Sequence, residues 1–184
     1  MNRTEQILDE LRSALSPDVL AQIPGFAREI SQSGQICCYG VGREGLIIKA
    51  LVMRLYHLGF AAHVVGDMTT PRLGINDMLI VSAGPGNFST VAALVDVARK
   101  AGSKVVCITS EPDGLVPLSA DIVVNLPAQT MATTKKGNVV TSILPMGSLY
   151  EVIMFLFFEL LVLEIRDVLG ISYDDMSAMH TNLE

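Results

Sequence analysis

The sequence predicts an α/β protein, a three-layer α/β/α sandwich with a five-stranded parallel sheet. Five short segments are apolar almost throughout, which is typical of strands that are buried on both faces. Segments with apolar residues at helical spacing stand between most of these strands. Glycine-rich loops directly follow the first and the third of them. Because the strands of such a sheet run parallel, both loops are expected at the same edge.

Two helices are expected before the first strand. The apolar residues of segment 4–15 recur on one helical stripe, and Thr4 is the candidate N-cap. Ser16 and Pro17 are typical of a helix start, so a second helix is predicted over 17–31.

The remaining elements alternate along the chain. The expected strands are 35–39, 61–65, 78–82, 104–109 and 122–126. The expected helices are 46–58, 89–101, a short helix or turn at 115–120, and a long last helix that begins between 141 and 148 and ends before Gly170. One domain over 1–184 is predicted, with leading helices in 1–33, a core in 34–128, a polar loop at 129–138, the long helix in 139–169 and a tail in 170–184.

Composition excludes several classes of function. The 184 residues carry a net charge of −6 without a Lys/Arg-rich run, which argues against a nucleic-acid partner. The apolar segment 149–163 contains two glutamates and is too short to span a membrane, so it is expected to be a helix buried on most sides. Charges among the apolar residues of the N-terminus lead us to expect no secretory signal there. The three cysteines have no metal-ligand spacing, so buried thiols in the cytoplasm and no metal site are expected.

The first loop, 40–45, has the pattern GxGxxG between a strand and a helix. Glycines and the free N–H groups of a helix start form a cradle for anions, here with Gly42, Arg43 and Glu44. A dinucleotide site with Asp67 as its acid, a sugar-phosphate site and a turn that binds nothing are all open alternatives. Glu44 would repel a phosphate in this cradle, whereas Arg43 could offset that charge or pair with it.

The second loop, 82–90, stands at the matching position after the third strand. Its candidate ligand-binding residues are Gly84, Gly86, Asn87, Ser89 and Thr90. The glycines allow close approach, and the two hydroxyls can cap the next helix and donate to an anion. The alternative is a helix cap with no ligand.

Glu151 is the candidate acid–base group. On the last helix it shares a face with apolar residues, and desolvation there would raise its pKa toward neutrality. Two alternatives stay open: Ser148 and Glu151 also form a capping-box pattern, and Glu159 could be the buried acid of that face. Lone histidines are more often structural than catalytic, and His180 in the tail matters only if the tail packs into a neighbouring subunit.

Several stretches together resemble the SIS (sugar isomerase) domain family, closest to its 6-phospho-3-hexuloisomerase branch. They are GVGREGLIIKALVMRLYHLGF (40–60), VVGDMTTPRLGINDMLIVS (64–82), SILPMGSLYE (142–151) and MHTNLE (179–184). The resemblance covers nearly the whole chain.

The resemblance implies a flavodoxin-like parallel sheet, a homo-oligomer (dimer or tetramer), and isomerisation of 3-hexulose 6-phosphate to fructose 6-phosphate without a cofactor. A cis-enediol is the implied intermediate, with Glu151 as the base. The tail histidine that matches His180 is implied to serve a neighbouring subunit's site, and His57 is a further catalytic candidate.

The two loops depart from this branch. The first usually reads GRSG and here reads GREG; the second usually reads SGSGET and here reads AGPGNF. Several hydroxyl donors for a phosphate are thereby lost. An isomerase of a neutral or differently charged sugar, and a non-catalytic sugar-binding SIS module, are therefore the alternative functions.

Overall fold

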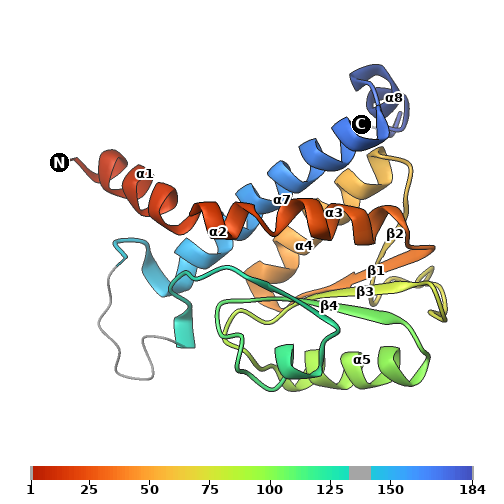
Figure 1. The fold of residues 1–184 in the computed structure, drawn as a ribbon, viewed down its shortest axis with the longest axis horizontal. Helices are drawn as coiled ribbons and strands as arrows, with labels where there is room; N and C mark the ends of the chain where they lie inside the picture. The colour runs from red at the N-terminus through yellow and green to blue at the C-terminus, as the bar shows by residue number, and fades with distance from the viewer. Residues whose placement is uncertain (1, 133–141, 184) are drawn as a thin grey trace.

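The computed structural model describes residues 2–132 and 142–183, and its centre is a parallel sheet (Figure 1). The predicted loop 129–138 and the predicted helix segment 139–169 therefore lie partly outside the described residues. The strands are β1 (Gln35–Tyr39), β2 (Ala61–Val64), β3 (Met78–Ser82), β4 (Lys104–Thr109) and β5 (Ile122–Asn125). They agree with the predicted strands to within one residue, and the predicted fold class is confirmed.

Helices surround this sheet on both faces. They are α1 (Arg3–Ala14), α2 (Pro17–Leu20), α3 (Ile23–Ser31), α4 (Gly42–His57), α5 (Ser89–Lys100), α7 (Ser148–Leu169) and α8 (Tyr173–Ala178). Two short 3₁₀ turns, η1 (Pro117–Ser119) and η2 (Pro145–Gly147), complete the described elements. The helices α1, α3, α4 and α7 lie on one side of the sheet and α5 on the other (Figure 1).

The strand order β2-β1-β3-β4-β5 places the first loop beside the second. The chain passes from β1 through α4 to β2 on one side, and then crosses to β3 on the other side of β1. The connections that leave the carboxyl ends of β1 and β3 therefore diverge, which opens a crevice between them. Ligands of open parallel sheets bind in such crevices.

Successive strand residues point to opposite faces of the sheet, and both faces are buried. Cys38 and Ile80 pack into the cluster formed with α3, α4 and α7. Their neighbours Cys37 and Val81 pack into the smaller cluster under α5. This alternation explains why the strands are apolar throughout their length.

The two leading helices differ from the prediction in detail. Asn2 caps α1 and forms a capping box with Glu5, so Thr4 lies inside the helix and is not its N-cap. The single helix expected over 17–31 is broken into α2 and α3. Pro24, in the first turn of α3, has no N–H to donate to the preceding turn, which explains the break. Ser16 caps α2 as predicted.

The helix starts beside the crevice also shift. α4 begins at Gly42, four residues earlier than predicted, and so the residues of the first loop form its first turn. Phe88 stands at the N-cap position of α5 without a side-chain bond, and the predicted capping by Ser89 and Thr90 is wrong.

The long helix α7 buries one broad face against α3 and α4. Phe157 and Ile153 have no exposed surface, whereas Phe155 remains 42% exposed and further apolar side chains of α7 are also exposed. The predicted burial on most sides therefore holds for one face only. Of the helices in the described ranges, none is both long and apolar enough to cross a membrane.

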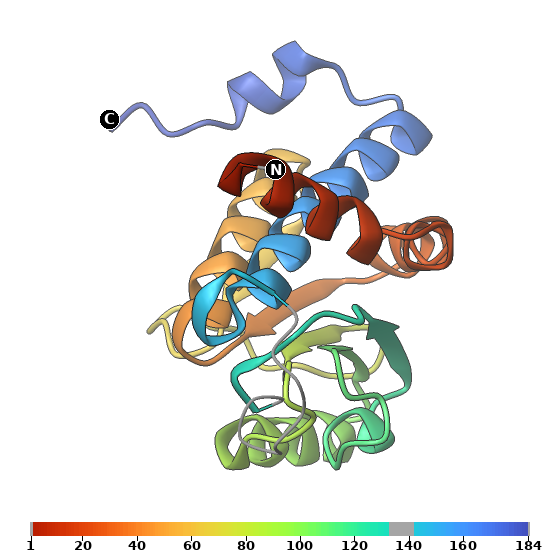
Figure 2. The ribbon, with the colours of Figure 1, turned by 90° about the vertical axis from the view of Figure 1, so that its left-hand side faces the viewer.

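The chain after α7 forms the short helix α8, which the sequence analysis did not predict. Figure 2 shows this tail extending beyond the helical layer. A capping box between Ser172 and Asp175 starts α8, and its described contacts with other elements are mainly with α4.

Truncation of Phe157 tests the packing of α7. Phe157→Ala leaves a cavity in the fully buried face and should lower the free energy of unfolding by about 3–5 kcal/mol. Val168→Ala, at a residue of the same helix that is 65% exposed, should cost less than about 1 kcal/mol. Urea unfolding followed by circular dichroism measures both, and equal losses would contradict the described packing.

Candidate active site

A cavity of about 540 Å³ opens at the carboxyl edge of the sheet, between the starts of α4 and α7 and the loop after β3. The wall is largely apolar, with Phe88, Met131 and Met146 among its residues. The lining residues in the described part of the chain are 41–44, Pro85, Asn87, Phe88, 130–132, 145–148, Tyr150 and Glu151. The cavity thus lies where the strand order predicts a ligand site.

Five of the residues singled out from the sequence line this cavity. They are Gly42, Arg43, Glu44, Asn87 and Glu151. They come from three elements that are far apart in the sequence. The cavity therefore unites the first loop, the second loop and the last helix, as the sequence analysis expected.

The other candidates of the second loop lie outside the lining. Gly86 has φ +82° and packs against Gly114. A Cβ atom added to Gly114 would lie 2.4 Å from the Cα atom of Gly86. Ser89 and Thr90 begin α5 and are not among the lining residues. Gly84 does not line the cavity, and its amide donates a hydrogen bond to Glu44, which does. These glycines therefore serve packing within the protein.

Glu151 faces the cavity because it does not cap its own helix. Gly147, in the left-handed region at φ +81°, precedes α7, and no side chain caps this start, so the capping-box alternative is wrong. The side chain of Glu151 is 13% exposed, and its Oε2 accepts a hydrogen bond from Arg43 Nε in an ion pair. The guanidinium is 65% exposed, so a ligand can reach both charges.

Glu44, unlike Glu151, has hydrogen-bond partners that carry no charge. Its Oε2 accepts hydrogen bonds from Ser82 Oγ at 2.5 Å and from the Gly84 amide at 3.0 Å. The side chain therefore turns beneath the second loop, although the residue still lines the cavity. The sequence analysis had placed this carboxylate beside the ligand without foreseeing its internal partners.

Burial raises the pKa of Glu44. The hydrogen bonds from Ser82 and Gly84 act in the opposite direction, and the nearby charge of Glu151 raises the pKa further. The cavity therefore holds two carboxyl groups in unlike surroundings. One is paired with a guanidinium and the other is bonded to neutral donors.

Tyr150 was missed by the sequence analysis. Its hydroxyl lies 3.2 Å from Ser82 Oγ, and its side chain is 1% exposed. Burial and the neighbouring Glu44 raise the pKa of this phenol well above its usual value. Its position directly before Glu151 was the available signal, because a buried tyrosine hydroxyl usually finds a polar partner.

The two candidate histidines lie at the other end of α4. The rings of His57 and His180 are 5.3 Å apart between centroids. His57 is fourteen residues after Arg43, or about 20 Å along the helix. Within one chain, the structure does not bring these histidines to Glu151. Glu159 is bonded to Arg54 and its side chain is 39% exposed, so the alternative that it is the buried acid is wrong.

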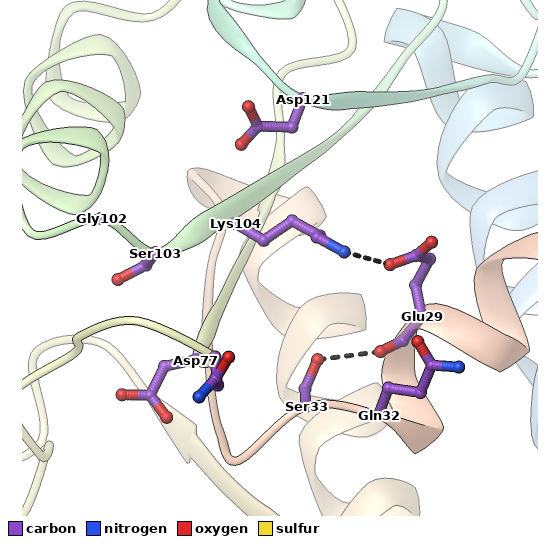
Figure 3. A pocket seen from close by; sticks show the side chains of 9 residues that line it. Glu29, Gln32, Ser33, Asp77, Gly102, Ser103, Lys104 and Asp121 are labelled. Carbon is purple, nitrogen blue, oxygen red and sulfur yellow. Dashed lines mark hydrogen bonds and ion pairs between the residues drawn. The ribbon is translucent and has the colours of Figure 1, made fainter.

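A second cavity, of about 420 Å³, opens at the opposite edge of the sheet. Figure 3 shows Lys104 of β4 reaching Glu29 of α3, with Asp77 and Asp121 nearby. Asp77 accepts a hydrogen bond from the backbone N–H of Gln35, and Asp121 accepts one from that of Val105. Both carboxylates therefore have a structural role at the start of a strand. In the described ranges, no group of three His, Cys, Asp or Glu residues is placed to hold a metal ion.

Comparison with known proteins agrees with this geometry. The sequence model of the SIS domain family matches residues 29–156. A 3-hexulose-6-phosphate isomerase of Mycobacterium gastri is 32% identical over all of this chain and 90% of its own length. The Bacillus subtilis protein of the same name is 31% identical over 97% of this chain and 96% of its own. The crystal structure of a Methanococcus jannaschii protein, for which that isomerase function was inferred, has a TM-score of 0.86 at 25% identity and covers both chains completely.

Substitution of Gly84 by alanine tests the close packing of this residue against two residues that line the cavity. An added Cβ on Gly84 would lie 2.7 Å from the Tyr150 ring and 2.9 Å from Glu44 Oε1. Since Tyr150 is fully buried and cannot move aside, Gly84→Ala should lower the free energy of unfolding by about 1–3 kcal/mol.

Gly25 in α3 is the matched control, because nothing lies within 4 Å of an added Cβ there. Gly25→Ala should raise the free energy of unfolding by about 0.5–1 kcal/mol. Denaturant titration of both variants is the measurement, and an unchanged or stabilised Gly84→Ala protein would contradict the close contact described.

Proposed function

Because the chain belongs to the SIS domain family, we propose that it is a sugar-phosphate isomerase that interconverts 3-hexulose 6-phosphate and fructose 6-phosphate. Full-length relatives carry the name of this activity. The observation that supports it in this chain is the carboxylate of Glu151, which faces the cavity and is paired with an accessible guanidinium.

Glu151 is the proposed base. Its carboxylate takes the proton from C2 of the 3-hexulose, next to the carbonyl at C3, and the electron pair of that bond forms an enediolate across C2 and C3. Transfer of the O2 proton to O3 and return of the abstracted proton from Glu151 to C3 give the 2-hexulose. The reaction moves hydrogens within one molecule and consumes no co-reactant. Arg43 beside Glu151 stabilises the negative charge of the enediolate.

The start of α4 is the proposed partner of the phosphate. The first N–H groups of a helix have no partner within it, and the helix dipole favours an anion at this end. Gly42 and Arg43 of that turn line the cavity, opposite Asn87 of the second loop. A sugar phosphate lying between them brings its carbonyl region toward α7.

A neutral sugar is the second candidate substrate. Pro85 and Phe88 line the cavity at positions where the usual SIS loop has hydroxyl residues, and Met131 and Met146 add further apolar surface. The same reaction through Glu151 would then act on a ketose without a phosphate group.

The exposed apolar stripes of α4 and α7 support a homo-oligomer. Leu46 and Met53 are 65% and 48% exposed on α4, and Phe155 lies on α7 between Glu151 and Glu159. These glutamates pair with arginines of α4, so α4 and α7 lie side by side along these exposed residues. A second copy of the chain is the proposed partner of this apolar face, because His180 would need a neighbouring subunit to reach a cavity.

We propose the cytoplasm as the location, since the three cysteines are free buried thiols.

Charged substitutions on the exposed apolar face of α4 and α7 test whether the protein is an oligomer. Met53→Glu combined with Phe155→Glu would bury two unpaired carboxylates in the interface and should reduce the molar mass measured by light scattering. Leu115→Glu, at a residue that is 67% exposed near η1, should leave the mass unchanged. A wild-type mass equal to one chain, 19.8 kDa, would contradict the proposal.

Substitution of Glu151 tests the reaction. Glu151→Gln keeps the size of the side chain but removes the base, and should lower kcat by about 10²–10⁴-fold. Glu159→Gln, on the same helix and away from the cavity, should retain activity. The measurement is turnover of fructose 6-phosphate and of fructose, with exchange of solvent deuterium into the sugar carbons.

Each outcome distinguishes the candidates. Exchange into fructose alone favours the neutral substrate. Binding of either sugar by the wild-type protein without any exchange identifies a non-catalytic binding module. Full turnover by Glu151→Gln would overturn the proposed role of this glutamate.

A further inference from the structure

Glu44 is a buried carboxyl at the wall of the cavity whose described partners are all neutral. Its exposed fraction is 8%, and both of its hydrogen bonds, from Ser82 Oγ and from the Gly84 amide, end on Oε2. In the described part of the chain, no hydrogen bond ends on Oε1. Arg43, the adjacent residue, is paired with Glu151 and not with Glu44.

The groups packed around Glu44 disfavour a second negative charge. Glu151 of α7 is a carboxylate at the same cavity and raises the pKa of Glu44, in addition to the larger effect of burial. Tyr150 of α7 and Cys107 of β4 supply no positive charge, because burial raises the pKa of the phenol well above its usual value and that of the thiol to about 12. The dipole of α4 and the two hydrogen bonds favour the anion, but burial outweighs the hydrogen bonds.

We propose that Glu44 takes part in binding as a neutral carboxylic acid whose Oε1–H group donates a hydrogen bond to an anionic oxygen of the sugar phosphate. This inference rests on the proposed function, because it concerns the substrate of the same cavity. A protonated carboxyl has one donor, as a hydroxyl side chain has. In this form Glu44 supplies a donor to a phosphate oxygen and no longer repels the phosphate. Glu44 thereby becomes the residue that decides whether the site accepts an anionic sugar.

The proposal has a defined dependence on pH. The acid form is present below the pKa of Glu44 and is lost as the pH rises through it. Above this pKa, each bound phosphosugar requires the uptake of one proton, so its Kd should rise about tenfold per pH unit. Binding of fructose, which carries no charge, should not follow this slope.

Calorimetric titration of the intact protein tests this dependence. Kd is measured for fructose 6-phosphate and for fructose between about pH 6.5 and 9, where the sugar phosphate, with a second pKa of about 6, is largely a dianion. The wild-type protein should show a rising Kd for fructose 6-phosphate over part of this range. Glu44→Gln should show no slope, because its amide donates at every pH. Glu159→Gln, on an outward-facing ion pair, should keep the wild-type slope.

A second readout does not depend on any variant. Titrations in buffers with different ionisation enthalpies measure the protons taken up on binding. The wild-type protein should take up close to one proton per fructose 6-phosphate at pH values above the pKa of Glu44, and none with fructose.

The contrary results are equally specific. Three results would overturn the proposal. The first is a Kd for fructose 6-phosphate that does not change with pH, together with no proton uptake. The second is the wild-type slope in Glu44→Gln, and the third is tighter binding of fructose than of fructose 6-phosphate at every pH. Failure of the proposed function looks different, because the phosphosugar would bind with the expected slope but without exchange of deuterium into its carbons.

Discussion

The hydrogen bonds from Ser82 and the Gly84 amide to the buried carboxyl of Glu44 join the end of β3 to the start of α4. Tyr150 adds α7 to this junction through its contact with Ser82. Three elements that are distant in the sequence are thus fastened at one point directly below the cavity. The position of Glu151 depends on this point, because it is the residue after Tyr150 on the same helix. A change in these contacts moves the reacting groups without touching a substrate.

Two carboxyl groups in one cavity can take different roles only if their surroundings differ. Glu151 is paired with a guanidinium that is open to solvent. Glu44 is buried, and burial raises its pKa. Such a division is typical of sites in which one carboxyl accepts a proton and another donates one. Here the cause is structural: Arg43 and Glu44 are neighbours in the first turn of α4, and their side chains point to different partners.

The sequence predicts the strands well because a strand buried on both faces must be apolar at every position, and that pattern is local. The break between α2 and α3 was missed because the apolar spacing continues through it, although Pro24 marked it. The orientation of Glu44 could not be predicted, since it depends on Ser82, which lies 38 residues away. The predicted meeting of the two loops needed only parallel strands, and the place of Glu151 beside them came from the resemblance to the SIS family. The distance between His57 and the cavity follows from the full length of α4.

Packing explains the two glycines that the second loop shares with the usual SIS pattern. Gly86 meets Gly114, and Gly84 meets the Tyr150 ring, at distances that leave no room for a side chain. The departures from that pattern fall instead on Ala83, Pro85, Asn87 and Phe88, and the last three of these line the cavity. The carboxyl of Glu44 lies beside Gly84 and accepts a hydrogen bond from its amide. Selection of the ligand therefore falls on the residues that face the cavity, and the buried carboxyl of Glu44 is one of them.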